Sequence, residues 1–212
     1  GLGMAHLNMA RLAAEKDDES AKQKYLGKLR EKIREAPRSF QVGIFFLGMG
    51  MDESARGNYE AAKRIFEDGV ELFKGIRSAN FQLIMRSEIG HVERRLGNLT
   101  EARLIYQETI QGWQELGNRS AIAHQLECFA FLALADEEPQ RAVKLFGAAE
   151  ALRERIHSPM TDHERVEYNP SVARLRTMLT EAEFYALWAE GRSTTVGLAI
   201  QIALDSAPTR RD

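Results

Sequence analysis

Apolar residues return along this chain at helical spacing, and the pattern itself recurs at a fixed interval. Three segments read GNYEAAKRIF (57–66), GNLTEARLIY (97–106) and EEPQRAVKLF (137–146), each with alanine at the sixth position and an aromatic residue at the tenth. Each segment opens an amphipathic helix whose apolar stripe needs a neighbour to cover it. Their starts at 57, 97 and 137 give a 40-residue period, which predicts a stack of similar supersecondary units.

Two helices fill each period. The first helices are predicted at about 41–56, 81–96 and 121–136, and the second helices at about 58–74, 98–116 and 138–155. Subtracting 40 once more places Ala10, Asp17 and Leu26 in the same register, so residues 1–36 predict a degenerate first repeat. Pro37 breaks the chain before the next helix.

Small residues recur inside the first helices at Gly50, Gly90 and Ala130, seven positions before each turn. Glycine inside a helix costs about 1 kcal/mol relative to alanine. Its recurrence therefore predicts a close approach by the paired helix. Gly57 and Gly97 lie between helices, where glycine takes the left-handed conformation that ends a helix.

The order of small residue, turn glycine, alanine and aromatic resembles the tetratricopeptide repeat. That family has a shorter usual period, of about 34 residues, and a period of 40 alone would also allow a HEAT-like helix pair. The internal phrase favours the tetratricopeptide type, with six extra residues lengthening helices or turns. The proline that closes the family's repeat is missing, as expected if the helices run on.

The predicted fold is an all-α right-handed solenoid of about four 40-residue tetratricopeptide-like helix pairs with a C-terminal helical cap. The repeats occupy residues 1–160 (about 1–40, 41–80, 81–120 and 121–160), and capping helices packed on the last repeat occupy 161–212. Thr161 with Glu164, and Thr180 with Glu183, have the spacing of capping boxes that start helices. A polar cap is what the end of a solenoid needs.

The segments LFGAAEALR (145–153) and FYALWAEGR (184–192) resemble the carboxyl end of large bacterial regulators. These are LuxR-type and maltose-activator-like signal-transduction ATPases, which join a nucleotide-binding domain to a tetratricopeptide stack. The resemblance implies a sensor or scaffold portion of a larger protein. The phosphate loop and the helix-turn-helix of that family are absent from these residues, so none of its functional residues carries over. A first repeat that begins almost at Gly1 also indicates a segment of a longer protein.

The first helices of such a stack usually line the concave surface that binds partners. Counting from the small residues gives the predicted groove set: Leu7, Arg11, Ile44, Leu47, Met51, Ile84, Ser87, His91, Arg94, His124, Glu127 and Phe131. Apolar anchors beside basic groups suit an amphipathic peptide or a helix of the same full-length protein. The alternative is that Leu47, Met51 and Phe131 are buried by tight curvature. Arg94→Glu should weaken partner binding without lowering the melting temperature.

The composition of the chain argues against nucleic acid and membranes as partners. The net charge of −2 and the pI near 6.3 give no footprint for nucleic acid or an anionic membrane. The longest uncharged run, Gln41–Met51, is too short to span a bilayer. Cys128 has no partner within the chain and lies in an apolar run, which predicts a buried thiol in the cytoplasm.

No cofactor, metal or catalytic residue is predicted. The glycine cluster at Gly48 follows no strand and lacks the lysine of a phosphate loop. The five histidines include no His-x-x-x-His pair and none at a metal-ligand spacing from Cys128, although His91 and His124 can approach each other across neighbouring first helices. The predicted function is a non-catalytic scaffold that binds a protein, a peptide segment, another domain of the same protein or a small-molecule inducer. A stand-alone adaptor that assembles a protein complex is the alternative, and an enzyme is the third reading.

Overall fold

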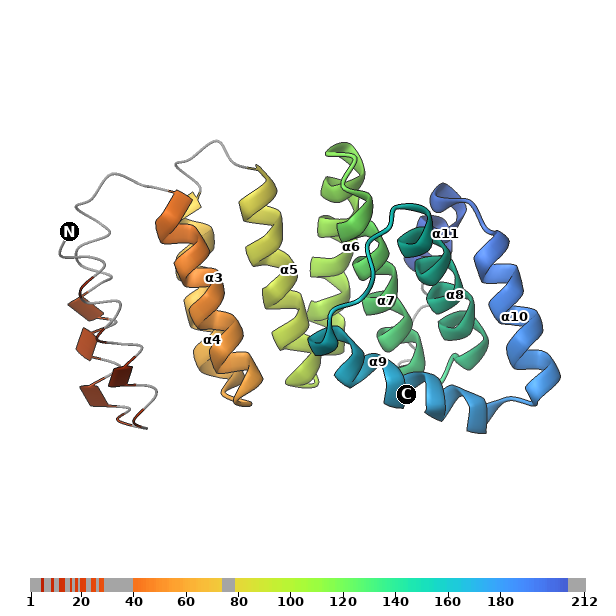
Figure 1. The fold of residues 1–212 in the computed structure, drawn as a ribbon, viewed down its shortest axis with the longest axis horizontal. Coiled ribbons are helices and arrows are strands. Elements are labelled where there is room, and N and C mark those ends of the chain that lie inside the picture. Colours follow the sequence, from red (N-terminus) through yellow and green to blue (C-terminus); the bar gives the residue numbers. More distant parts are fainter. Residues whose placement is uncertain are drawn as a thin grey trace.

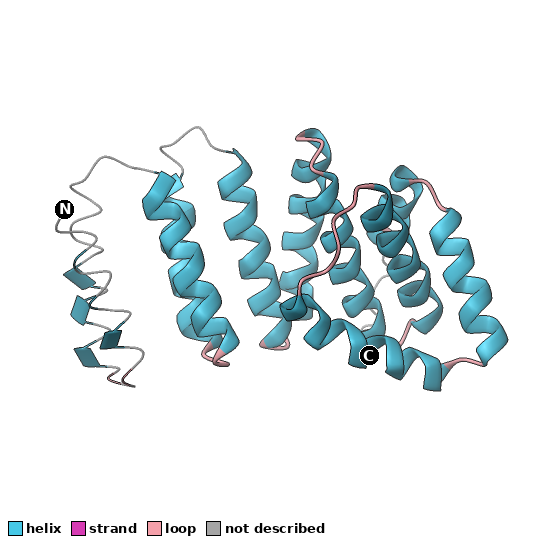
Figure 2. Cartoon of the chain, viewed as in Figure 1, coloured by secondary structure: helices cyan, strands magenta, loops and turns pink. Residues whose placement is uncertain are grey.

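The computed structural model describes residues 40–73 and 79–205 continuously, together with scattered positions before residue 40. Within these residues every regular element is an α-helix, as Figures 1 and 2 show, which confirms the predicted all-α class. The helices are α3 (Phe40–Ala55), α4 (Tyr59–Phe73), α5 (Ala79–Arg95), α6 (Leu99–Glu115), α7 (Arg119–Ala135), α8 (Pro139–Arg155), α9 (Asp162–Met178), α10 (Glu181–Ser193) and α11 (Val196–Leu204). Most of the predicted first repeat lies outside the described residues.

Helices α3 to α8 stack in order, each antiparallel to the next and packed against it. Helix α9 departs from this order, because it runs across the stack instead of alongside α8 (Figure 1). Helix α10 packs against α8 in its place, and α11 packs against α7 and α8. None of the helices in the described ranges combines the length and hydropathy that a membrane crossing requires.

From residue 79 to residue 155, each period of the sequence is built from two helices of equal length. Helices α5 to α8 each contain 17 residues and begin at 79, 99, 119 and 139, which leaves a three-residue turn between neighbours. The middle residue of each turn has a positive φ angle, at Gly97 (85°), Gly117 (64°) and Glu137 (60°). Gly57, between α3 and α4, has φ of 81°. The predicted left-handed conformation at Gly57 and Gly97 is therefore confirmed.

The small residues of the first helices accommodate the aromatic residues of the second helices. A Cβ atom added to Gly90 would lie 2.6 Å from Cε1 of Tyr106, and one added to Gly50 would overlap the Phe66 ring. Both rings are fully buried. The predicted close approach is thus confirmed, and its partner is the aromatic residue 16 positions later in the same repeat.

The cap is held to the stack by a close crossing of α8 and α10. A Cβ atom added to Gly147 would lie 2.5 Å from the backbone oxygen of Trp188, and one added to Gly191 would overlap the backbone of Lys144. The Trp188 indole N–H donates to Glu150 at 2.8 Å. Residues 145–153 and 184–192 therefore form one packing unit.

The capping boxes at the starts of α9 and α10 are present as predicted. The Thr161 hydroxyl accepts from the Glu164 backbone N–H at 3.3 Å, and the Glu164 carboxylate accepts from the Thr161 N–H at 2.6 Å. Thr180 and Glu183 make the same reciprocal pair. These contacts satisfy backbone donors that helix ends leave unpaired.

Candidate interaction groove

The predicted groove residues lie on α3, α5 and α7, except Leu7 and Arg11, which lie outside the described residues. At the α3 end the surface is open. Ile44 is 49 % exposed and Met51 is 41 % exposed, while Leu47 is half-buried beside the α3–α5 core. Ile44 and Met51 are therefore accessible to a partner.

At the other end of the groove, helix α9 covers Arg94. The Arg94 guanidinium forms a two-pronged ion pair with the Glu167 carboxylate, with Nη2 2.7 Å from Oε2. It also lies over the Phe131 ring, 4.7 Å from the centroid, where the ring's negative face attracts it. This end of the groove is thus occupied by a helix of the chain itself. Arg94→Glu is expected to repel Glu167, so it should also lower the melting temperature.

Arg95, the neighbour of Arg94, contacts both α3 at the open end of the groove and α9 at the covered end. Its Nη1 donates to the Ser54 hydroxyl of α3 at 2.8 Å, and its Nη2 lies 3.6 Å from the Glu167 carboxylate. The side chain remains about one-quarter exposed, at 27 %. A partial positive surface therefore remains available between Met51 and α9.

A buried ion cluster fixes the start of α9. Arg153 of α8 donates to the Glu127 carboxylate at 2.6 and 2.9 Å and to Glu164 of α9 at 2.6 Å. Glu127 is 2 % exposed and is held inside the protein. Burial opposes the charge of Glu164, but His124, the Thr161 N–H and Arg153 hold the pKa of Glu164 well below its usual range. The carboxylate stays ionised and anchors α9.

Ser87 and Ile84 contribute to packing between helices. The buried Ser87 hydroxyl accepts from the Trp113 indole N–H at 3.3 Å and donates to Gln125 Oε1 at 3.4 Å. Thr109 donates to the same oxygen at 2.9 Å. Ile84 is half-buried against the core. Direct contact of these two groove residues with a partner stays a prediction.

His91 and His124 come together as the sequence allows. Their Nε2 atoms lie 3.3 Å apart, and the rings meet edge to face. Burial and the neighbouring charge of His124 lower the pKa of His91 well below its ordinary value. Burial also opposes a charge on His124, but Cys128, Glu127 and Glu164 raise its pKa well above the ordinary value. The two rings therefore share one hydrogen bond between their Nε2 atoms.

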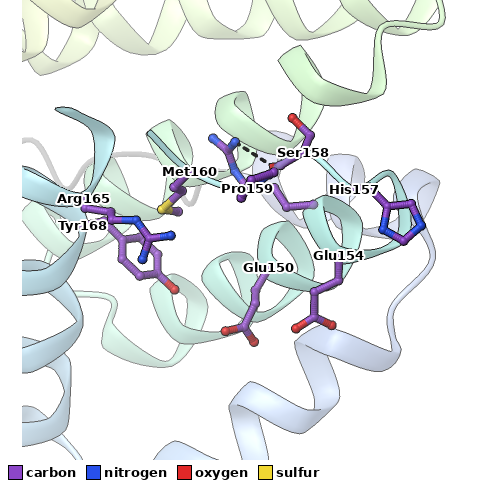
Figure 3. A pocket seen from close by; sticks show the side chains of 9 residues that line it. Glu150, Glu154, His157, Ser158, Pro159, Met160, Arg165 and Tyr168 are labelled. Atoms are coloured by element: carbon purple, nitrogen blue, oxygen red, sulfur yellow. Dashed lines mark hydrogen bonds between the residues drawn. The ribbon is translucent and has the colours of Figure 1, made fainter. Parts of the chain in front are cut away.

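Two cavities flank α9. One, of about 510 Å³, lies on the groove side and is bordered by Met51, Arg95, Phe131 and Glu167 among others. The other, also about 510 Å³, lies between α9, the end of α8 and the linker that joins them. Figure 3 shows Arg165 and Tyr168 of α9 on one side of this second cavity, across from Glu150 and Glu154 of α8. Helix α9 therefore has open space on two of its flanks.

Within α5 and α6, the glycine, alanine and aromatic positions lie where a tetratricopeptide helix pair would need them. Residues 83–116 match the tetratricopeptide repeat family. The matched segment covers most of α5 and all of α6, and the same helix geometry continues in the neighbouring pairs. A comparison with curated proteins gave no significant match over any part of the chain.

The sequence did not predict the position of α9 or the ion pairs that hold it. Arg94 and Glu167 are 73 residues apart, and no periodicity connects them. One signal was present: Glu164 and Glu167 fall on one face of a helix that follows a basic groove. Arg153 is the last residue of the segment 145–153, and nothing in the sequence marks it as the partner of Glu127.

Proposed function

We propose that this chain is a non-catalytic scaffold that binds a helical segment of a protein in the groove of α3, α5 and α7. The observation that carries the proposal is α9, a carboxylate-bearing helix whose Glu167 pairs with Arg94, the residue that lies over Phe131. A tetratricopeptide match at residues 83–116 supports an interaction role for the same surface. Groove recognition of an amphipathic helix is a recurring mode of peptide binding.

The segment that fits the open end is an amphipathic helix with apolar and acidic residues. Exposed Ile44 and Met51 offer contacts for apolar anchors, and Arg95 offers a donor for a carboxylate. Because Arg95 already lies 3.6 Å from Glu167, an acidic partner helix would continue the charge pattern that α9 begins. Charge complementarity of this kind favours specificity and encounter rate.

The wider context that we propose is a larger bacterial signalling or transcription regulator located in the cytoplasm. The support is the resemblance of residues 145–153 and 184–192 to that family, together with their packing as one unit between α8 and α10. A Walker-type Gly-x-x-x-x-Gly-Lys-Ser/Thr motif upstream in the full-length protein would support this context. A natural start near Met4 would favour the adaptor.

Selection of peptides from a library of acidic and neutral amphipathic helices tests the proposal. Peptides that bind the whole chain should lose at least tenfold in affinity on Met51→Asp or Arg95→Glu, which corresponds to about 1.4 kcal/mol. The matched control is Arg64→Glu, an exposed arginine of α4 on a second helix. Equal affinities for all four proteins would place binding outside the groove and reject the proposal.

A further inference from the structure

Three potential metal ligands converge where α5 faces α7. His91 comes from α5, and His124 and Cys128 lie four residues apart on one face of α7. The His91 and His124 Nε2 atoms are 3.3 Å apart, and Cys128 Sγ lies 3.6 Å from His91 Nδ1. One ligand atom from each residue falls within 4.8 Å of the other two. The expectation that no histidine lies at a metal-ligand spacing from Cys128 is therefore wrong, because His124 precedes Cys128 by about one helical turn.

The distance between the two histidines matches a shared cation. With Zn–N bonds of about 2.0–2.1 Å, two nitrogens of a tetrahedral site lie roughly 3.4 Å apart. A hydrogen bond between the rings also explains the observed separation, since one Nε2–H then points at the other Nε2. A zinc ion would replace that single proton and use the lone pairs of both rings.

The far nitrogens of both rings are held by oxygen atoms. His91 Nδ1 lies 2.8 Å from the Tyr106 hydroxyl, and His124 Nδ1 lies 3.1 Å from Glu164 and 3.3 Å from Glu127. Metal-binding histidines usually have such partners, which fix the ring orientation and direct the other nitrogen toward the ion. The two Nε2 atoms therefore face each other, and the Cys128 thiolate joins the same ion by turning its Sγ from His91 Nδ1 toward them.

The surrounding charges allow a cation to enter. Arg94 and Arg95, whose charges act on His91, both lie within ion-pair distance of Glu167 of α9, and Arg153 is paired with Glu164 of the same helix, so these positive charges are largely neutralised. A cavity of about 280 Å³ reaches both histidines, bordered by Glu88 and Glu164 among others. His124 is 35 % exposed, which gives an ion a path from solvent.

We propose that His91, His124 and Cys128 bind one zinc ion, which bridges α5 and α7 on the floor of the groove. Imidazole nitrogens and a thiolate are a ligand set that suits zinc, and a water molecule can complete the tetrahedron. Binding displaces a proton from the thiol and one from the histidine pair. Because Glu164 holds His124, the ion would also support the start of α9. This site goes beyond the proposed scaffold function and does not depend on it.

Zinc titration of the whole chain by calorimetry, with thermal unfolding alongside, tests the site. We expect one zinc ion per chain and a melting temperature that rises with zinc concentration, because the ion binds the folded state. His91→Gln and Cys128→Ser should each weaken zinc binding at least tenfold. His157→Asn is the matched control, since His157 is an exposed histidine outside the cluster.

Cobalt provides a second readout that a merely structural histidine pair would not give. Cobalt bound by the wild-type chain should show a thiolate-to-cobalt charge-transfer band that Cys128→Ser lacks. If His91→Gln fails to fold by circular dichroism, Cys128→Ser alone decides through this band. Absence of zinc binding, zinc binding unchanged in Cys128→Ser, or a cobalt complex without the thiolate band would each overturn the proposal.

Discussion

Replacing Arg153 by methionine tests the buried charges that join α7, α8 and the cap. Arg153 donates twice to Glu127, a carboxylate that is only 2 % exposed. Removing one partner of a buried ion pair leaves an uncompensated charge and costs roughly 3–5 kcal/mol. Because His124 Nδ1 also lies 3.3 Å from Glu127, we expect the lower end of that range, about 3 kcal/mol.

Thermal unfolding followed by circular dichroism measures this loss. A cost of about 3 kcal/mol should lower the Tm of a chain of this size by roughly 6–12 °C. Methionine keeps most of the unbranched stem of arginine, so little of the effect should come from packing. Arg155→Met, on the exposed side of the same helix, is the matched control and should stay within about 0.5 kcal/mol of wild type.

The double variant Arg153→Met with Glu127→Leu separates charge from shape. An apolar pair of similar volume often equals or exceeds a buried ion pair in stability, so the second substitution should recover most of the loss. Purely additive losses would mean that Arg153 acts by packing alone. That result would refute the reasoning about the buried charge.

Four further substitutions test the helix pairs and the cap by thermal unfolding. Gly90→Ala should destabilise the protein by roughly 1–3 kcal/mol because the added methyl group overlaps the Tyr106 ring. This cost should exceed the gain from the better helix propensity of alanine. A higher Tm would contradict the close packing of Gly90 against Tyr106. Glu137→Gly should stabilise by up to about 1 kcal/mol because φ is 60° there, whereas Gly97→Ala, at φ 85°, should lower the Tm. Because the pKa of Glu164 is lowered in the folded protein, the ionised carboxylate stabilises the fold fully above about pH 4.3, and this stabilisation is lost as the pH falls through the lowered pKa. The drop in Tm between pH 4 and pH 2 should therefore be smaller in Glu164→Gln than in the wild type. An equal drop in both proteins would exclude this role of Glu164.

The helix pairs could be predicted from sequence because their determinants are local. Gly90 and Tyr106 belong to one repeat, and the same spacing recurs one period earlier at Gly50 and Phe66. Burial of an aromatic ring against a glycine is a short-range consequence of two helices joined by a tight turn. The periodicity of the sequence therefore predicts both where the helices begin and end and which residues form the core.

The occupant of the groove could not be predicted in the same way. The register placed Glu127 on the groove face, but Arg153 of α8 pairs with it inside the protein, and Arg153 also pairs with Glu164 of the non-repeating α9. The capping box at Thr161 predicts where α9 begins and says nothing of the surface that it crosses. Ion pairs between distant segments produce no repeating pattern in the sequence. Only the three-dimensional structure therefore shows that α9 covers half of the groove.

The most direct test of the proposed function is nuclear magnetic resonance of methyl-labelled methionines during titration with a selected helical peptide. Met51 is 41 % exposed on α3 at the open end of the groove, and Met178 is 37 % exposed at the last residue of α9. We predict that the Met51 methyl signal shifts in proportion to bound peptide while the Met178 signal stays in place. A peptide that shifts Met178 and leaves Met51 unchanged would contradict binding in the groove.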